Sequence, residues 1–306
     1  MKCAYCGKEA KGTREHIISC AILDLFPECC ATVDPVRKIM YEADPTIKDV
    51  CSECNNNKIS YIDKYAKDFI GRYFVQKYNE YDNVQIEFNY TMIQKILLKY
   101  AFNDMRSQKA DCSFFDKEIL HYLLNEDDTI PKENISVLCG IAVNVSPLPD
   151  AVFGNVKLRW VKDPAFLSNS MVDFIDGTHQ IYFNDAVSRQ EFYDLRVSYV
   201  FRFNSAQFLL MCWDRKSKKI EENKAILACR YPYHLLCADE TSAVLPVCTN
   251  AYNYHSIELI NVKWDRLFEI GILQRWANGE SYLYKEFYEK EWKKEEEAIR
   301  QAHPRQ

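Results

Sequence analysis

The sequence predicts an α+β protein in three parts, and three observations support this prediction. Residues 1–80 hold two pairs of closely spaced cysteines, followed by an amphipathic segment. Residues 81–130 place apolar side chains at helical spacing, which predicts a helical connector. Residues 131–306 contain short apolar or alternating runs separated by Pro, Asn, Asp and Gly, which predict a mainly antiparallel β domain that also includes helix.

The composition is that of an ordinary globular chain. With 306 residues, of which 48% are hydrophobic and 27% charged, and with only 8 glycines, it excludes disordered and collagen-like classes. No apolar run reaches the length of about 18 residues that a membrane span needs. The first residues, MKCAYCGKEAKG, lack the apolar core of a secretory signal. We therefore expect a cytoplasmic protein that does not bind membranes.

Charge and cysteine content narrow the function classes. The chain has 39 basic and 44 acidic residues, a net charge of −5, which argues against tight, unassisted binding to nucleic acid. Its 13 cysteines are an odd number, and in a reducing compartment they suit metal ligands and core thiols better than disulfides.

Two closely spaced cysteine pairs, here called knuckles, are the first candidate functional feature. Cys3 and Cys6 form one C-x-x-C pair, and Cys51 and Cys54 form another. Each pair can direct two thiolates at one ion, so together they predict a closed, structural four-sulfur zinc site. The alternative is that the pairs are chance neighbours in a cysteine-rich chain.

A candidate reactive group lies between and just after the knuckles. Glu15 and His16 are adjacent, so on a strand they would point to opposite faces. From Asn55 onward we expect one helix, because the apolar side chains fall on the same stripe as Asn55. That stripe consists of Ile59, Ile62, Ala66, Phe69 and Tyr73. If the helix packs on the hairpin that carries Glu15 and His16, these three polar residues come together.

The remaining elements follow in chain order. The segments TMIQKILLKYAFNDMRSQ and FFDKEILHYLLNEDD predict two helices. Runs such as ISVLCGIAVNV, YVFRF and QFLLMCW predict strands, and SYLYKEFYEKEWKKEEEAIRQA predicts a closing charged helix. The tryptophans are interpreted as core rather than as a base-stacking platform. They are Trp160, Trp213, Trp264, Trp276 and Trp292. His179, His234 and His255 are interpreted as isolated histidines rather than a second metal site.

The combination C-x-x-C, T-R-E-H-I-I, C-x-x-C-N-N-x-K and I-D in the first 75 residues resembles the zinc-knuckled HNH endonucleases. The resemblance implies a ββα-metal module within residues 1–80. Cys3, Cys6, Cys51 and Cys54 would bind structural Zn²⁺. His16 would be the general base, while Glu15 and Asn55 would hold a catalytic Mg²⁺ or Mn²⁺. Lys58 and Arg14 would contact the nucleic-acid backbone.

The resemblance also implies a substrate and possible partners. DNA is the expected substrate and RNA stays open, because such a site contacts phosphate and sugar more than base. A weakly charged nuclease would need help from an activating protein, a second messenger or a second copy of the chain. A setting in phage defence or restriction would suit it.

Two points are left open by the sequence. The middle asparagine of the family motif has no clear match, and Asp44, Thr46 or Asp49 could replace it. Asp63 is interpreted as an exposed carboxylate rather than a supporting group for the site. The rival hypothesis for the whole module is a non-catalytic, zinc-stapled unit that binds nucleic acid or protein.

Overall fold

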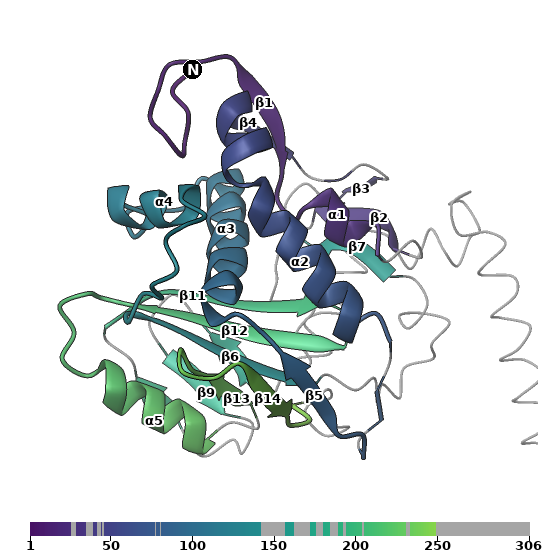
Figure 1. Ribbon diagram of the computed structural model, residues 1–306, viewed down its shortest axis with the longest axis vertical. Helices are drawn as coiled ribbons and strands as arrows, with labels where there is room; N and C mark the ends of the chain where they lie inside the picture. Colours follow the sequence, from purple (N-terminus) through teal and green to yellow (C-terminus); the bar gives the residue numbers. More distant parts are fainter. Residues whose placement is uncertain are drawn as a thin grey trace, which may run out of the picture.

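The computed structural model has a mixed helix and sheet architecture, in agreement with the predicted α+β class (Figure 1). It describes residues 1–248, apart from 26–28, 35–38, 42–43, 45, 77, 80, 142–156, 162–171, 176–179, 184–188, 192–193, 204 and 231–232. The expected C-terminal helix, His179, His255 and the three last tryptophans lie outside the described residues.

The first unit is a strand pair followed by helix. Strand β1 (Gly12–His16) pairs antiparallel with β4 (Thr46–Cys51), with His16 opposite Thr46. The chain then enters a π-helix, η1 (Glu53–Lys58), and continues as α2 (Ser60–Tyr73). The expected single helix from Asn55 is therefore two helices, because the wider π turn joins the second knuckle to α2. Ile62, Ala66 and Phe69 are buried along α2, as their spacing predicts.

The long connection between β1 and β4 carries its own short elements. Helix α1 (Cys20–Leu23) follows β1, and Ser19 caps it by accepting a hydrogen bond from the Ala21 amide. Strand β2 (Cys29–Asp34) pairs antiparallel with β3 (Ile39–Tyr41) and parallel with β7 (Lys157–Val161). Two segments far apart in sequence thus share one small sheet.

Helix α3 (Tyr90–Gln108) is the central helix of the described chain. It begins at the cap Asn89, whose side chain accepts from the Met92 amide, and ends at Lys109 in the left-handed conformation. Helix α4 (Lys117–Leu124) follows, capped by Asp116. Both helices were expected. Burial on almost every side of α3 was not, and it encloses polar groups such as Lys95, Lys99 and Asn103.

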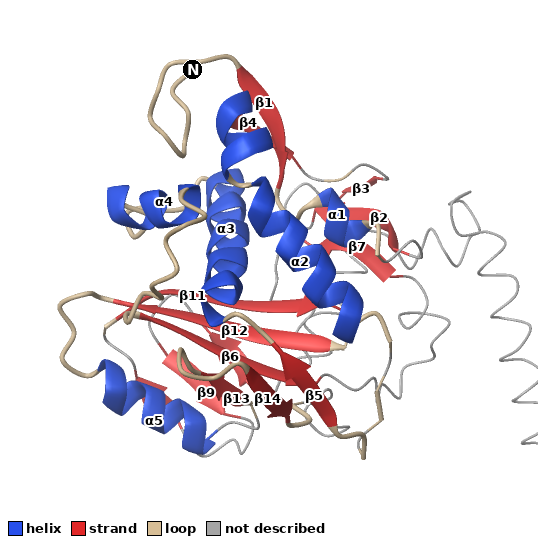
Figure 2. Cartoon of the chain, viewed as in Figure 1, coloured by secondary structure: helices blue, strands red, loops and turns tan. Residues whose placement is uncertain are grey.

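A four-stranded antiparallel sheet lies next to α3, on the side away from β1 and β4 (Figure 2). Its order is β11 (Leu195–Phe203), β12 (Ala206–Trp213), β6 (Ile135–Ile141) and β13 (His234–Leu236). Both β6 and β12 are buried along their whole length. Helix α3 packs on one face of the sheet, and α5 (Ile220–Arg230) lies on the opposite side (Figure 1).

The remaining strands form two further sheets. Strand β5 (Val84–Glu87) pairs antiparallel with β14 (Ser242–Leu245). Strands β8 (Val172–Ile175), β9 (Gln180–Phe183) and β10 (Arg189–Glu191) form an antiparallel sheet. Among the described helices, none combines the length and apolar character needed to cross a bilayer.

Two interpretations of single residues can be compared with the fold. Trp213 is fully buried and its indole N–H donates to Ser136 Oγ at 2.9 Å, so it is a core residue as predicted. His234 contacts Glu240 Oε2 at 2.9 Å through Nε2.

One hydrophobic core runs from the cysteine knuckles through α2 and α3 to the sheet. The boundaries at residues 80 and 130 stay a prediction.

Candidate functional site

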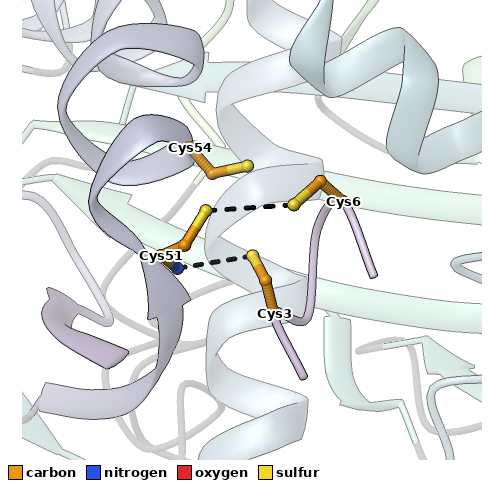
Figure 3. A group of neighbouring side chains, drawn as sticks. All are labelled: Cys3, Cys6, Cys51 and Cys54. Carbon is orange, nitrogen blue, oxygen red and sulfur yellow. Dashed lines mark hydrogen bonds between the residues drawn. The ribbon is translucent and has the colours of Figure 1, made fainter. Parts of the chain in front are cut away.

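The two cysteine knuckles converge on one point (Figure 3). The sulfur atoms of Cys3, Cys6, Cys51 and Cys54 all lie within 4.8 Å of one another, and those of Cys6 and Cys51 are 3.8 Å apart. Tetrahedral zinc with Zn–S bonds of about 2.3 Å places its sulfurs about 3.8 Å apart. The four thiols therefore fit a structural zinc ion. Among the described residues, it is the one group of three or more His, Cys, Asp or Glu side chains whose ligand atoms lie close enough together to hold a metal.

Backbone hydrogen bonds shape both knuckles. The Gly7 amide donates to the Cys3 carbonyl at 2.9 Å, and Gly7 has a φ of +70°, a conformation that glycine adopts without steric cost. The Ala4 amide donates to the Asp49 carbonyl at 2.8 Å, which ties the first knuckle to β4. In the second knuckle, the Ile59 amide reaches back to the Cys54 carbonyl at 3.0 Å and closes the π turn.

The thiols differ in how easily they ionise. Burial opposes ionisation of Cys3, but hydrogen bonds from backbone amides, including that of Cys51, lower its pKa to about 7. Burial and the neighbouring thiols raise the pKa of Cys54 well above its ordinary value. Cys3 therefore ionises more readily than Cys54, and a bound cation would favour the thiolate form of its ligands.

The π-helix brings Asn55 against β1. Its side-chain Nδ2 donates to Thr13 Oγ1 at 3.1 Å and to the Arg14 carbonyl at 3.0 Å. Its Oδ1 accepts no hydrogen bond from the described residues. The structure therefore places the Asn55 side chain against β1, the strand that carries Glu15 and His16, and its Oδ1 is an oxygen that a ligand could contact.

His16 stands at the end of β1 with its side chain 37% exposed. Its Nε2 lies 3.9 Å from the Asp44 carboxylate, which is a distance for electrostatic interaction rather than a hydrogen bond. Of the three candidates for the missing middle asparagine, Thr46 is paired opposite His16 on β4. Asp49 forms an ion pair with Arg106, so Asp44 is the carboxylate that faces His16.

Glu15 points the other way, into the protein. Its side chain is 5% exposed, and its Oε1 lies 3.0 Å from Lys99 Nζ and accepts from Asn103 Nδ2 at 3.2 Å. Its Oε2 accepts no hydrogen bond from the described residues. Asp63 joins the same group, because Lys99 Nζ donates to both of its oxygens, at 2.7 and 2.6 Å. Asp63 is therefore a partner of the buried lysine and not the exposed carboxylate that we expected.

The expected nucleic-acid contacts are available to solvent. Arg14 and Lys58 are both exposed, and neither forms an ion pair with a described residue. Arg14 lies at the irregular pairing between Thr13 and Glu15, where β1 bulges against β4.

Sequence reasoning missed the α3 residues that support this site. Lys99 and Asn103 are fully buried, yet a lysine and an asparagine within a helical pattern are expected on its exposed face. Their spacing was the one feature of the sequence that could have indicated a shared role. They lie four residues apart, so they share one face of the helix and can contact the same neighbour.

Comparison with protein-family models, with curated proteins and with solved structures finds no match to this chain.

Proposed function

We propose that the protein is a metal-dependent endonuclease that hydrolyses DNA phosphodiester bonds with an HNH-like module in its first 80 residues. One observation carries the proposal. The thiol cluster brings the first knuckle together with β4 and η1, and this arrangement leaves a half-exposed His16 beside Asp44 while Asn55 of η1 donates hydrogen bonds to β1, the strand that carries His16.

His16 is the proposed general base. Its exposure lets water approach the imidazole, and a neutral imidazole can take a proton from a water that attacks phosphorus. The Asp44 carboxylate faces Nε2 and favours the tautomer that carries its proton there. Nδ1 is then the nitrogen that accepts the proton from the attacking water.

Asn55 and Glu15 are the proposed ligands of the divalent ion. Asn55 Oδ1 and Glu15 Oε2 are oxygen atoms that no described residue hydrogen bonds, and oxygen is the donor that Mg²⁺ and Mn²⁺ prefer. When bound, such an ion polarises the scissile phosphate and stabilises the leaving oxygen.

Arg14 and Lys58 are the proposed phosphate contacts. Both are exposed cations near the candidate site, and phosphate contacts position the strand without reading its sequence. Because the whole chain carries a charge of −5, affinity for DNA should be modest and salt-sensitive. An activating protein, a second messenger or a second copy of the chain would raise it. RNA is a second possible substrate.

The rival proposal, a non-catalytic zinc-stapled binding module, is favoured by one contact. Glu15 is buried and already interacts with Lys99 and Asn103, as a residue that only stabilises the fold would do. The rival predicts a protein that binds nucleic acid or protein and retains that binding when His16 is replaced.

The experiment that separates the two is cleavage of supercoiled plasmid in low salt with Mg²⁺ or Mn²⁺. Wild type, His16→Ala and His121→Ala are compared at equal zinc content, since His121 is an exposed histidine on α4. We expect wild type and His121→Ala to nick or linearise the plasmid and His16→Ala to lose at least about a hundredfold in rate. Equal cleavage by all three would contradict the mechanism. Binding without cleavage by wild type would support the rival.

A further inference from the structure

Three polar residues on one face of α3 contact the zinc-stapled unit, which consists of the two cysteine knuckles, β1, β4, η1 and the start of α2. Lys99, Asn103 and Arg106 recur at helical spacing, and α3 runs beside α2 below the β1–β4 pair (Figure 1). Lys99 contacts Glu15 and Asp63, and Arg106 forms an ion pair with Asp49. The face therefore contacts β1, β4 and α2.

Asn103 makes the contact nearest to His16. Its Nδ2 donates to the His16 carbonyl at 3.0 Å and lies 3.4 Å from the Ile17 carbonyl. Its Oδ1 accepts from the Tyr5 hydroxyl at 2.8 Å, in the first knuckle. Asn103 is fully buried, so water does not compete for these groups.

The hydrogen bonds from Asn103 lie where strand β1 ends. Strand β1 ends at His16, whose pairing with Thr46 is the last in the ladder, and the chain then turns toward the cap of α1. The carbonyls of His16 and Ile17 lie at this end, where strand pairing stops fixing the backbone. A buried carbonyl without a donor would cost about 1–3 kcal/mol, and the Asn103 amide supplies that donor.

We propose that Asn103, on a helix outside the zinc-stapled unit, is a positioning residue that fixes the backbone of His16 and so aims its imidazole. Lys99 assists by holding Glu15, the preceding residue, through Oε1. The kinetic part of this inference rests on the proposed nuclease function, while its structural part does not. A shift of about 1 Å at a reacting group can cost about a hundredfold in rate.

The test is Asn103→Ala in the full zinc-loaded chain, with Asn134→Ala as the matched control. Asn134 is also a buried asparagine whose Nδ2 donates to a backbone carbonyl, that of Trp213 at 3.0 Å, but it lies in the sheet region. The readout is the imidazole Cε1–H signal of His16 in protein labelled at histidine. The chain has 6 histidines, and His16→Gln identifies the signal.

We expect Asn103→Ala to move or broaden the His16 signal and Asn134→Ala to leave it in place. In cleavage assays, Asn103→Ala should lower kcat about tenfold to a hundredfold with KM changed less than about twofold. An unmoved His16 signal in Asn103→Ala, or an equal change in Asn134→Ala, would overturn the inference. If wild type cleaves nothing, the proposed function fails, while the histidine signal still decides the positioning role.

A second variant covers the case in which Asn103→Ala does not fold. Asn103→Asp combined with Glu15→Gln keeps the acceptor for Tyr5 and the total charge, and lets an amide at position 15 donate to the new carboxylate. It still removes the donor to the His16 carbonyl. Glu15→Gln alone is the control for the change next to His16. We expect the double variant to displace the His16 signal further than Glu15→Gln does, and an equal displacement in the two would count against the inference.

Discussion

Lys99 is the residue on which the buried polar group depends. Its side chain is 1% exposed and lies between the carboxylates of Glu15 and Asp63, so among the described residues its charge is the one that pairs with both. Removing one partner of a buried ion pair leaves an uncompensated charge, at a cost of about 3–5 kcal/mol.

Lys99→Met should therefore lower the free energy of unfolding by about 3 kcal/mol, measured by urea denaturation. The comparison is Lys64→Met, which removes an exposed lysine of α2 and should change stability by less than about 0.5 kcal/mol. If Lys99→Met unfolds at the same urea concentration as Lys64→Met, the group is not held by this charge.

Lys95 predicts a pH effect on stability. Burial lowers its pKa to about 8 although Asp128 and Glu126 oppose the shift, and Lys132 adds a like charge. Its ammonium contacts the rings of Tyr61 and Tyr122. The folded state binds this proton less tightly than the unfolded state, whose lysine pKa is about 10.4. Stability contributed by this group is therefore lowest below pH 8 and rises between pH 8 and 10.

The measurement is the difference in unfolding free energy between wild type and Lys95→Met at pH 7 and pH 10. Wild type should gain relative to the variant as pH rises, because only wild type releases this proton. Taking the difference cancels the tyrosines and cysteines that titrate in both proteins. A difference that stays constant, or that moves the opposite way, would contradict the shifted pKa.

At the scale of elements, the zinc knuckles should control the local stability of β4 and η1. Cys51 ends β4 and Cys54 lies in η1, so these elements meet at the thiol cluster. Without metal, the raised pKa of Cys54 favours its neutral thiol, and the ligands lose the ion that holds them together.

Chelation of zinc should therefore speed amide exchange in Thr46–Cys51 and Glu53–Lys58 by about tenfold or more, a local loss of at least about 1.4 kcal/mol. Exchange in β6 and β12 should change much less, because both strands are buried along their length in the sheet. Hydrogen exchange with mass detection measures both regions in one experiment. Uniform acceleration would show that zinc supports the whole fold equally.

The same elements show how much the sequence predicts. The paired knuckles predicted the thiol cluster, since C-x-x-C spacing alone restricts where two thiols can point. Apolar periodicity predicted α2 and α3, because burial of one face follows from spacing. It did not predict the burial of Lys99 and Asn103, since those residues are buried only through partners on β1 and α2. Asp44 could not be chosen over Thr46 or Asp49 either, because the register of β4 decides which of them faces His16.

At the scale of the whole molecule, the proposed zinc-stapled unit shares its core with the rest of the chain. Phe69 and Phe74 contact Phe208 of β12, with ring centroids 6.5 and 6.1 Å apart. The inner face of α2 and the buried Glu15 are also covered by α3. Separation of residues 1–80 from the remainder would expose all of these groups to water.

We therefore expect a fragment of residues 1–80 to bind zinc but to lack a cooperative thermal transition. The four cysteines that could hold zinc all lie within the fragment, so we expect metal binding to survive. The apolar side chains of α2 lose the surface that buries them, and each large side chain left exposed forgoes about 1.5–3 kcal/mol. Zinc content, calorimetry and binding of a hydrophobic dye would be measured on the fragment and on the full chain. A sharp transition in the zinc-loaded fragment would show that the unit folds alone and that α3 only adds to it. A broad transition with strong dye binding is the expected result, because the surfaces that bury the apolar side chains of α2 belong to α3 and β12.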